Sequence, residues 1–175
     1  MGSEHLLLAG GGHSHALLLK RWAMQPQQRP KGLITLVSSS SASLYSGLVP
    51  AYIAGLNTHQ SINIDMRWLA QQAGVAFIQA EITGLNPEGT LLLLNRTALP
   101  FERLSLNVGA ITHQQGFRHA IPIKPLQPAL EVIAIADAEA HPPAADPFHI
   151  VGAGLAAVEV ALSLRRRWPR RRLHL

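Results

Sequence analysis

Residues 6–15, LLLAGGGHSH, set the architecture of the chain's first half. Four apolar residues in succession, 6–9, predict a short strand buried on both faces, as in a parallel sheet. Three glycines follow at once, and the apolar run 16–19 after them predicts a helix. A strand, a glycine turn and a helix in this order are typical of a phosphate-binding turn, because unpaired N–H groups at the helix start attract anions.

The glycine turn follows the G-x-G-x-x-G pattern of dinucleotide-binding folds at its first two positions. Gly10 supplies a tight turn, and Gly12 has no side chain, so a pyrophosphate is expected to approach its backbone closely. The third position, usually Gly or Ala, is His15. This is a departure from the pattern, because close contact between helix and strand favours a small residue there.

Composition indicates a globular protein, with 175 residues, 47% hydrophobic residues and a mean hydropathy of +0.14. The length predicts one full domain and a surplus. The absence of cysteine excludes disulfides, thiolate zinc sites and a redox dithiol, and it is compatible with the cytoplasm, where we expect the protein. The first residues lack the features of a signal peptide, and no apolar run approaches the roughly 20 residues that span a bilayer.

The net charge of +5 comes from one cluster, since six arginines occupy positions 165–172. The remaining nine basic residues face ten acidic ones, so the body of the chain is near neutral. A solvated helix end is one interpretation of the cluster, and binding to nucleic acid or acidic lipid is the other. Because the body has no basic face with aromatic residues, we expect no nucleic acid partner, whereas peripheral membrane contact stays open.

A second strand, predicted at 33–37, follows the helix that starts at 13 or 14 and ends near 24, which completes a βαβ unit. Dinucleotide folds usually carry Asp or Glu at the end of this strand for a ribose hydroxyl. Four serines, 38–41, stand there instead. A serine hydroxyl binds a ribose more weakly and less selectively than a carboxylate does.

The middle of the chain predicts a packed loop with a short helix over 44–55 and a helix over 66–73, capped by Asp65 and stopped by Gly74. Strands at 75–83, 90–95 and 98–101, with a turn at 86–89, predict a small antiparallel meander. A strand at 104–108 then rejoins the main sheet. A further helix is expected at 127–140, with Pro128 in its first turn.

The opening pattern returns after a linker-like segment, 141–147, where we place a domain boundary. Residues 148–151 predict a strand, 152–157 read G-x-G-x-x-A, and 158–164 predict its helix. Residues 170–175 predict the start of a further strand. We therefore divide the chain into a first nucleotide-binding domain, 1–140, the linker, and the incomplete start of a second such domain, 148–175.

Two glycine turns separated by a meander and a linker resemble the FAD-dependent pyridine nucleotide-disulfide oxidoreductases. The segments LLLAGGGHSHALLL, LYSGLVPAYIAG, LSLNVGA, HAIPIKP and HIVGAGLAAVEVALSL together resemble the type II NADH dehydrogenase-like branch, some members of which are fused to selenide, water dikinase. The resemblance implies an α/β flavoprotein: a Rossmann-like FAD-binding domain with a parallel sheet and a small antiparallel meander, then a truncated NAD(P)-binding domain. It implies an N-terminal portion, inactive alone, of an enzyme that passes hydride from NAD(P)H to FAD and on to a quinone or another acceptor.

The resemblance also implies cofactor-binding residues and no catalytic side chain, because the flavin carries the redox chemistry. For the FAD pyrophosphate they are Gly10, Gly11, Gly12, Ser14, His15, Gly109 and Ala110. For the adenosine end they are Ser38, Ser39 and Ile82. Tyr45, Ser46 and Pro50 are implied near the isoalloxazine, and Gly152, Gly154 and Glu159 near the nicotinamide cofactor.

Several alternatives stay open at this point. Tyr45, in an apolar stretch, is explained better as a core residue than as a flavin contact, and Glu159 is explained equally well as part of a solvated helix face. A metal pair of His13 and His15 is disfavoured, because residues i and i+2 of a helix do not face one way. A non-catalytic Rossmann-like nucleotide-binding or scaffold module is the rival function. The expected open sheet edge predicts a cover, either a second copy of the chain as a homodimer or the strand near Ile150.

Overall fold

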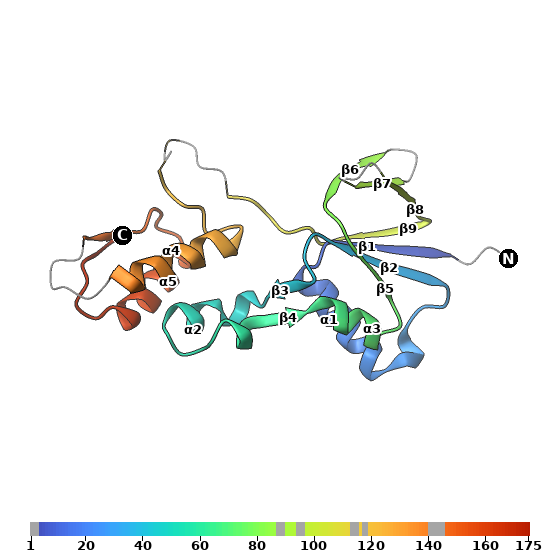
Figure 1. Cartoon of the computed structure of the whole chain (residues 1–175), viewed down its shortest axis with the longest axis horizontal. Coiled ribbons are helices and arrows are strands. Elements are labelled where there is room, and N and C mark those ends of the chain that lie inside the picture. The colour runs from blue at the N-terminus through green and yellow to red at the C-terminus, as the bar shows by residue number, and fades with distance from the viewer. Residues whose placement is uncertain (1–3, 87–89, 94–96, 113–115, 117–118, 140–145) are drawn as a thin grey trace. The chain divides into compact units, whose positions relative to one another are not determined.

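The computed structural model describes residues 4–86, 90–93, 97–112, 116, 119–139 and 146–175 (Figure 1). The chain forms two compact units, and each consists of two segments of sequence. The first unit contains Met1–Ser43 and Asn63–Gly109, and the second contains Leu44–Ile62 and Ala110–Leu175.

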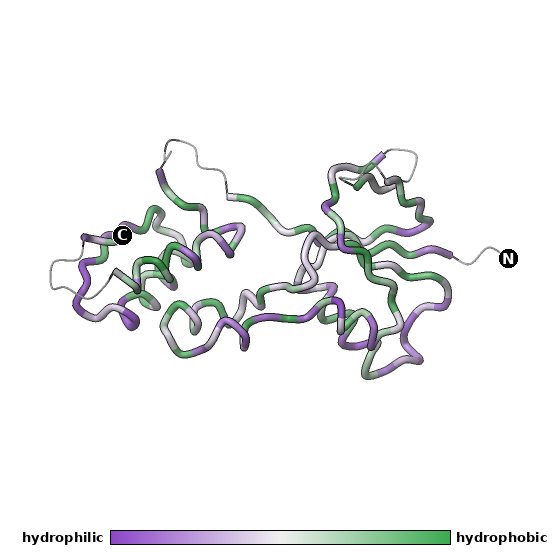
Figure 2. Tube along the Cα trace, in the orientation of Figure 1, coloured by the Kyte–Doolittle hydropathy of each residue, from purple (hydrophilic) through white to green (hydrophobic). Residues whose placement is uncertain are grey.

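A four-stranded parallel sheet forms the centre of the first unit, in the order β5-β2-β1-β9. Its strands are β1 (His5–Ala9), β2 (Leu33–Ser38), β5 (Ala76–Gln79) and β9 (Arg103–Leu106). Leu8 of β1 is in register with Leu36 of β2 and with Ser105 of β9. Figure 2 shows apolar residues along β1 and β2, as expected of strands buried on both faces.

Successive residues of β1 supply different hydrophobic clusters, because neighbouring side chains of a strand point to opposite faces. Leu8 packs in one cluster with helices α1 (His13–Met24) and α3 (Met66–Gln72), through residues such as Leu19 and Met66. Leu7 packs in another with Leu93 of the meander. The sheet is therefore covered by helices on one face and by the meander on the other (Figure 1).

The meander consists of β6 (Ile82–Asn86), β7 (Thr90–Leu93) and β8 (Ala98–Pro100), and its predicted antiparallel pairing is confirmed. The single predicted strand 75–83 is wrong, because 76–79 form β5 of the parallel sheet and β6 begins only at Ile82. The predicted turn at 86–89 and the end of the predicted strand at 94–95 lie largely outside the described residues. Asp65 caps α3 by accepting a hydrogen bond from the Trp68 amide at 2.8 Å, and Gly74 follows the helix with φ +65°. Both predictions for this helix are confirmed.

Short elements connect the larger ones. A 3-10 turn, η1 (Pro26–Gln28), follows α1. Strands β3 (Ala42–Leu44) and β4 (Asn63–Asp65) form a two-stranded sheet that the sequence did not predict. Between them the chain contributes η2 (Ser46–Leu48), α2 (Val49–Ile53) and η3 (Gln60–Ile62) to the second unit.

The second unit contains α4 (Leu126–Glu139), β10 (Phe148–His149), α5 (Leu155–Arg167) and β11 (Leu173–His174). Strands β10 and β11 are parallel, so β10, α5 and β11 form a second βαβ unit, as predicted. Its core is a cluster of buried residues from α2, η3, α4 and α5 with Trp168, among them Ile53, Ile62, Ile133 and Leu164.

Two sequence predictions concern the end of the chain. Only Asp146 and Pro147 of the predicted linker lie within the described residues, so the division into 1–140, 141–147 and 148–175 stays a prediction. The strand near Ile150 was expected as one cover for the open sheet edge. In the described part of the chain this expectation is wrong, because the Ile150 amide donates to the His174 carbonyl at 2.8 Å and β10 pairs with β11.

Candidate functional site

The first glycine turn lies at the carboxyl ends of β1, β2 and β9. Gly10 has φ +97°, which a residue with a side chain rarely adopts. The Gly10 amide donates to the Val37 carbonyl at 2.8 Å, and the Gly12 amide donates to the Asn107 carbonyl at 3.2 Å. The turn is thereby attached to the ends of both strands that flank β1.

The absence of side chains in this turn has an internal cause. A Cβ atom at Gly12 would lie 2.1 Å from Asn107 Oδ1, and one at Gly10 would lie 2.2 Å from the Asn107 carbonyl oxygen. A Cβ atom at Gly11 would lie 2.7 Å from Ser38 Oγ. The sequence explained Gly12 by the approach of a pyrophosphate, but the space beside it is taken by Asn107. Asn107 is not among the residues that the sequence predicts for the site, because its local signal is only its place at the end of a predicted strand.

Some N–H groups of the turn and of the first turn of α1 are available to a ligand. Gly12 is the N-cap of α1 and provides no side-chain cap. Within the described residues, the amides of Gly11, Ser14 and His15 have no protein acceptor. Unpaired donors at a helix N-terminus, next to the positive end of its dipole, form a site suited to an anion such as a diphosphate.

The His15 side chain faces the interior. It is only 2% exposed, with Nδ1 2.7 Å from the Gly10 carbonyl oxygen and Nε2 2.9 Å from Ser105 Oγ. Burial lowers the pKa of His15, and the hydrogen bond to Gly10 offsets part of this effect. The neutral imidazole therefore donates from Nδ1 and accepts from the Ser105 hydroxyl, which leaves only the His15 backbone amide for a phosphate. His13 is exposed, so the two histidines do not face one another.

The other residues predicted for FAD are divided between the units. Ser38 is buried beside Gly11, and its Oγ accepts from the Ser40 amide at 3.4 Å, whereas Ser39 is exposed. Ile82 is half-buried at the start of β6, and Gly109 has φ +84° with open space around it. The residues that belong to the second unit are Tyr45, Ser46, Pro50 and Ala110. The structure thus brings Gly10, Gly11, Gly12 and Ser38 together.

The second glycine turn has the same elements and a different environment. Gly152 has φ +129°, and Gly154 is the N-cap of α5 without a side-chain cap. A Cβ atom at Gly154 would meet no atom within 4 Å. Glu159 is exposed on α5, where its carbonyl accepts from Ser163 Oγ at 2.8 Å. The turn is open to solvent, and its role in nucleotide binding stays a prediction.

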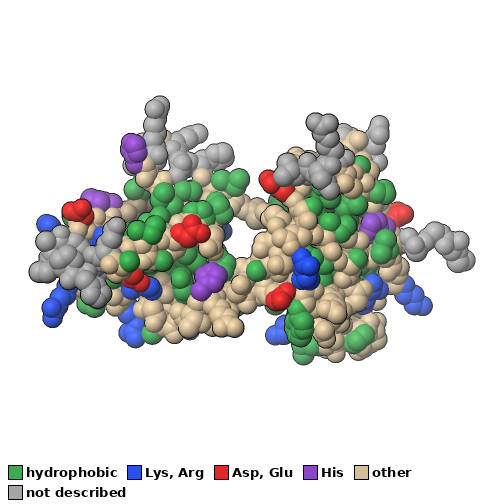
Figure 3. Space-filling model, in the orientation of Figure 1, with side chains coloured by type: hydrophobic (Ala, Val, Ile, Leu, Met, Phe, Trp, Pro, Cys, Tyr) green, Lys and Arg blue, Asp and Glu red, His purple; other side chains and the backbone are tan. Residues whose placement is uncertain are grey.

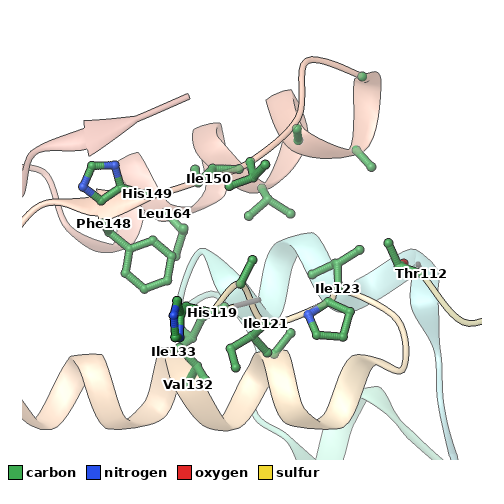
Figure 4. Close-up of a pocket in the computed structure, with 18 of the residues that line it drawn as sticks. Thr112, His119, Ile121, Ile123, Val132, Ile133, Phe148, His149, Ile150 and Leu164 are labelled. Atoms are coloured by element: carbon green, nitrogen blue, oxygen red, sulfur yellow. The ribbon is translucent and has the colours of Figure 1, made fainter. Parts of the chain in front are cut away.

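An apolar cavity of about 810 Å³ lies in the second unit, between α4, β10, α5 and the segment 119–123. Side chains from these elements, such as Ile121, Ile133 and Phe148, lie around it, with His119 among the polar groups (Figure 4). Gly154 and Ala157 also line it. The sequence did not predict this cavity, because the segment 111–147 has no periodicity that shows which side chains face one another.

The arginine-rich end of α5 contributes to the core of the second unit. Asp137 of α4 accepts from Arg167 Nε at 2.8 Å and from Trp168 Nε1 at 2.6 Å. Arg167 also donates to the Tyr52 and Ile53 carbonyls at the end of α2, at 3.1 and 3.2 Å. The hydrogen bond from Arg167 lowers the pKa of Asp137, against the opposing effect of burial. We call Asp137, Arg167 and Trp168 the α4–α5 clamp.

Arg171 lies over the Trp168 ring, with its guanidinium carbon 4.9 Å from the ring centroid, so this residue also has an internal role.

In the view of Figure 3, basic side chains are scattered among acidic and neutral ones. Within the described ranges, no helix has the length and apolar character needed to cross a bilayer, and no group of three or more candidate metal ligands is present.

No protein-family model matches the sequence, and a search of curated proteins finds no significant match. Solved structures do match. A sulfide:quinone oxidoreductase from the hyperthermophilic bacterium Aquifex aeolicus superposes with a TM-score of 0.68 and 18% identity, over 98% of this chain and 42% of that chain. A ferredoxin reductase from Rhodopseudomonas palustris gives 0.68 and 20% identity, over 94% and 41%.

NDH2 from Plasmodium falciparum, solved in complex with NADH, gives a TM-score of 0.66 and 17% identity, over 95% of this chain and 39% of that chain. The chain has the fold of these oxidoreductases. This oxidoreductase fold confirms the predicted α/β, Rossmann-like class with its parallel sheet and antiparallel meander. The chain spans about two fifths of the length of the structures it matches.

Proposed function

We propose that this chain is the nucleotide-binding portion of an oxidoreductase that binds FAD at the first glycine turn and receives hydride from NAD(P)H bound at the second. One observation supports this most strongly: a strand, a glycine turn, a helix and a parallel strand occur twice, as β1–α1–β2 and β10–α5–β11. Each helix begins at a glycine without a side-chain cap. Two such units suit two dinucleotides.

The residues of the first turn fit the diphosphate of FAD. The unpaired amides of Gly11, Ser14 and His15 would hold it. In this proposal Ser38 and the exposed Ser39 lie at the ribose, Ile82 contacts the adenine, and Gly109 and Ala110 pass beside the diphosphate. Tyr45, Ser46 and Pro50 lie near the isoalloxazine. When bound, FAD supplies the redox chemistry, and the chain binds and orients it.

The second turn is proposed as the NAD(P)H site, with Gly152 and Gly154 near the diphosphate and Glu159 on the helix that follows. Support comes from the open space beside Gly154 and from the NADH in the NDH2 structure of the same fold. A quinone as final acceptor is the finer proposal, supported by the likeness to a sulfide:quinone oxidoreductase. The domain boundaries 1–140, 141–147 and 148–175 belong to the same proposal.

Titration of the purified full chain with FAD tests this function. We expect FAD to co-elute with the chain in gel filtration and to show a perturbed visible absorption spectrum, because the isoalloxazine leaves water. Because the proposal is of a portion that is inactive alone, we expect no bleaching of the flavin band when NADH is added without oxygen, and bleaching would show that the second site delivers hydride in this chain. A folded chain that leaves FAD free in solution would contradict the proposal.

The scaffold module is the second candidate, and one observation favours it. The amides of Gly10 and Gly12 are already bonded to Val37 and Asn107, so the first turn is partly closed by the chain itself. A scaffold is expected to unfold at the same temperature with and without FAD, whereas a ligand that binds only the folded state raises that temperature. The two candidates therefore differ in one thermal measurement.

The edge of the sheet at β9 is proposed as a contact with a second copy of the chain. Strand β9 pairs with β1, and it is the last strand of the four-stranded sheet on its side. Leu106, the last residue of β9, is 59% exposed, and Val108, just after the strand, is 63% exposed. Unpaired strand edges with exposed apolar residues favour strand addition. A scattering mass that stays monomeric at high concentration would contradict this proposal.

A further inference from the structure

The peptide between Gly10 and Gly11 is bonded to the protein on one side only. Its carbonyl oxygen lies 2.7 Å from His15 Nδ1. Its N–H group, on Gly11, has no acceptor within the described residues. The bond is trans, since the cis bond found in the described chain is Lys124–Pro125. In a trans peptide the C=O and N–H groups point in opposite directions.

The hydrogen bond from His15 therefore determines where the Gly11 N–H points. Because the Gly10 carbonyl is held toward the buried imidazole, the Gly11 N–H of the same trans peptide is directed away from that imidazole. If the peptide rotated, the Gly10 carbonyl would lose its hydrogen bond to His15. The Gly11 N–H would then face His15 Nδ1, which is itself a donor. Burial of the imidazole makes such a loss costly.

The imidazole is itself fixed by the neighbouring strand. Its Nε2 accepts a hydrogen bond from the Ser105 hydroxyl of β9 at 2.9 Å. The ring proton is therefore on Nδ1, which donates a hydrogen bond to the Gly10 carbonyl. Alanine or glycine at position 15, the usual residues of the fingerprint, would provide no such donor. The departure at the third fingerprint position thus has a geometric role in this chain.

We propose that His15 is a positioning residue that holds the Gly10–Gly11 peptide so that the Gly11 N–H faces the diphosphate of the cofactor. The inference rests on the proposed function, because FAD is the ligand that the amide would meet. His15 acts through the peptide and does not touch the ligand with its side chain. Ser105 contributes by fixing the tautomer of His15.

Two substitutions distinguish the hydrogen bond at Nδ1 of His15 from the hydrogen bond at Nε2. In His15→Asn the side-chain amide can replace the Nδ1 donor, and in His15→Gln it can reach toward Ser105 instead. We expect FAD to bind His15→Asn within about threefold of the parent chain, and His15→Gln or His15→Ala to bind about tenfold or more weakly, as for a lost hydrogen bond to a charged group. His5→Ala is the control. It removes another part-buried histidine side-chain contact, between His5 Nε2 and Thr35 Oγ1 at 3.0 Å, and His5 lies at the opposite end of β1 from the glycine turn.

A second readout does not depend on FAD. In the nitrogen-15 NMR spectrum of the free chain, we expect a protonated Nδ1 on His15 and a Gly11 amide resonance that moves in His15→Gln and stays in place in His15→Asn. A protonated Nε2 in the parent, or a Gly11 resonance unchanged by His15→Gln, would overturn the positioning role. The positioning role would also be overturned if all His15 variants and His5→Ala weakened FAD binding equally. Failure of the parent to bind FAD, with the expected NMR result, would overturn the proposed function instead.

Discussion

The two glycine turns have similar backbone conformations at their helix N-caps, but the residues around them differ. Gly12 and Gly154 are both helix N-caps, with φ/ψ of −72°/170° and −80°/171°. A Cβ atom at Gly12 would overlap Asn107, whereas one at Gly154 would meet nothing within 4 Å. Internal packing therefore requires the fingerprint glycine at position 12, whereas at position 154 no contact with the described residues requires it.

This difference separates two reasons for a glycine that a sequence pattern cannot distinguish. In the first unit the turn is held by backbone hydrogen bonds and by His15, so it is formed before any ligand arrives. In the second unit the described contacts that join α4 and α5 lie away from the turn, in the apolar core and in the α4–α5 clamp. The first turn is therefore preorganised, which lowers the entropy cost of binding a diphosphate.

The largest effect is expected from alanine at the two matched glycines. Gly12→Ala should lower the free energy of unfolding by roughly 2–3 kcal/mol, because the new methyl group overlaps Asn107. Gly154→Ala should cost about 0.5 kcal/mol or less. Denaturant unfolding of both variants measures the difference. Equal costs at the two positions would show that Asn107 moves aside freely.

The next effect concerns the clamp. Asp137→Ala should destabilise the second unit by about 1–2 kcal/mol, because Arg167 and Trp168 lose their shared acceptor. Arg166→Ala, an exposed neighbour on α5, is the matched control and should change stability by less than about 0.5 kcal/mol. Hydrogen exchange of α4 and α5 reports the loss. An unaltered exchange rate in Asp137→Ala would show that the clamp is a surface contact of no consequence.

A smaller effect is expected from pH. The pKa of His15 is lowered in the folded chain, so the unfolded chain binds the extra proton first as pH falls below about 6.5. This contribution to stability is present above that pH and is lost on acidification toward the folded pKa, by at most about 1.4 kcal/mol per pH unit. The slope should disappear in His15→Asn. Unfolding curves at several pH values test it, and an equal slope in both chains would assign the effect to other groups.

The smallest effect is expected at the exposed arginines. Replacement of Arg166, Arg170 and Arg172 by glutamine should leave stability within about 0.5 kcal/mol, because these side chains are exposed and the clamp uses Arg167. Affinity for a nucleic acid probe should also stay unchanged. A marked loss of a salt-dependent affinity would instead revive the interaction hypothesis for this cluster.

The regular elements of the fold were predictable from residue patterns. The run of apolar residues in β1, the Asp65 cap and the parallel return of residues 104–108 each gave a local signal that the structure confirms. The β3–β4 pair was missed, because its strands are three residues each, too short for a periodic signal. Such strands depend on contacts distant in sequence.

The candidate site was predictable only in part. The glycines were found by their pattern, but the roles of Asn107 and His15 follow from tertiary contacts across 95 and 90 residues, which no local pattern encodes. The arginine cluster was interpreted as a solvated end, whereas Arg167 and Arg171 are used internally. A charge run in a sequence does not show which of its members meets a buried carboxylate.

The most direct test of the account is an amide NMR titration of the full chain with FAD. We predict that the Gly11 and Ser14 resonances shift first and saturate together, while those of Gly152 and Gly154 stay in place until NADH is added. Shifts confined to the second turn, or no shift at Gly11 in a chain that binds FAD, would contradict a diphosphate held by the first turn.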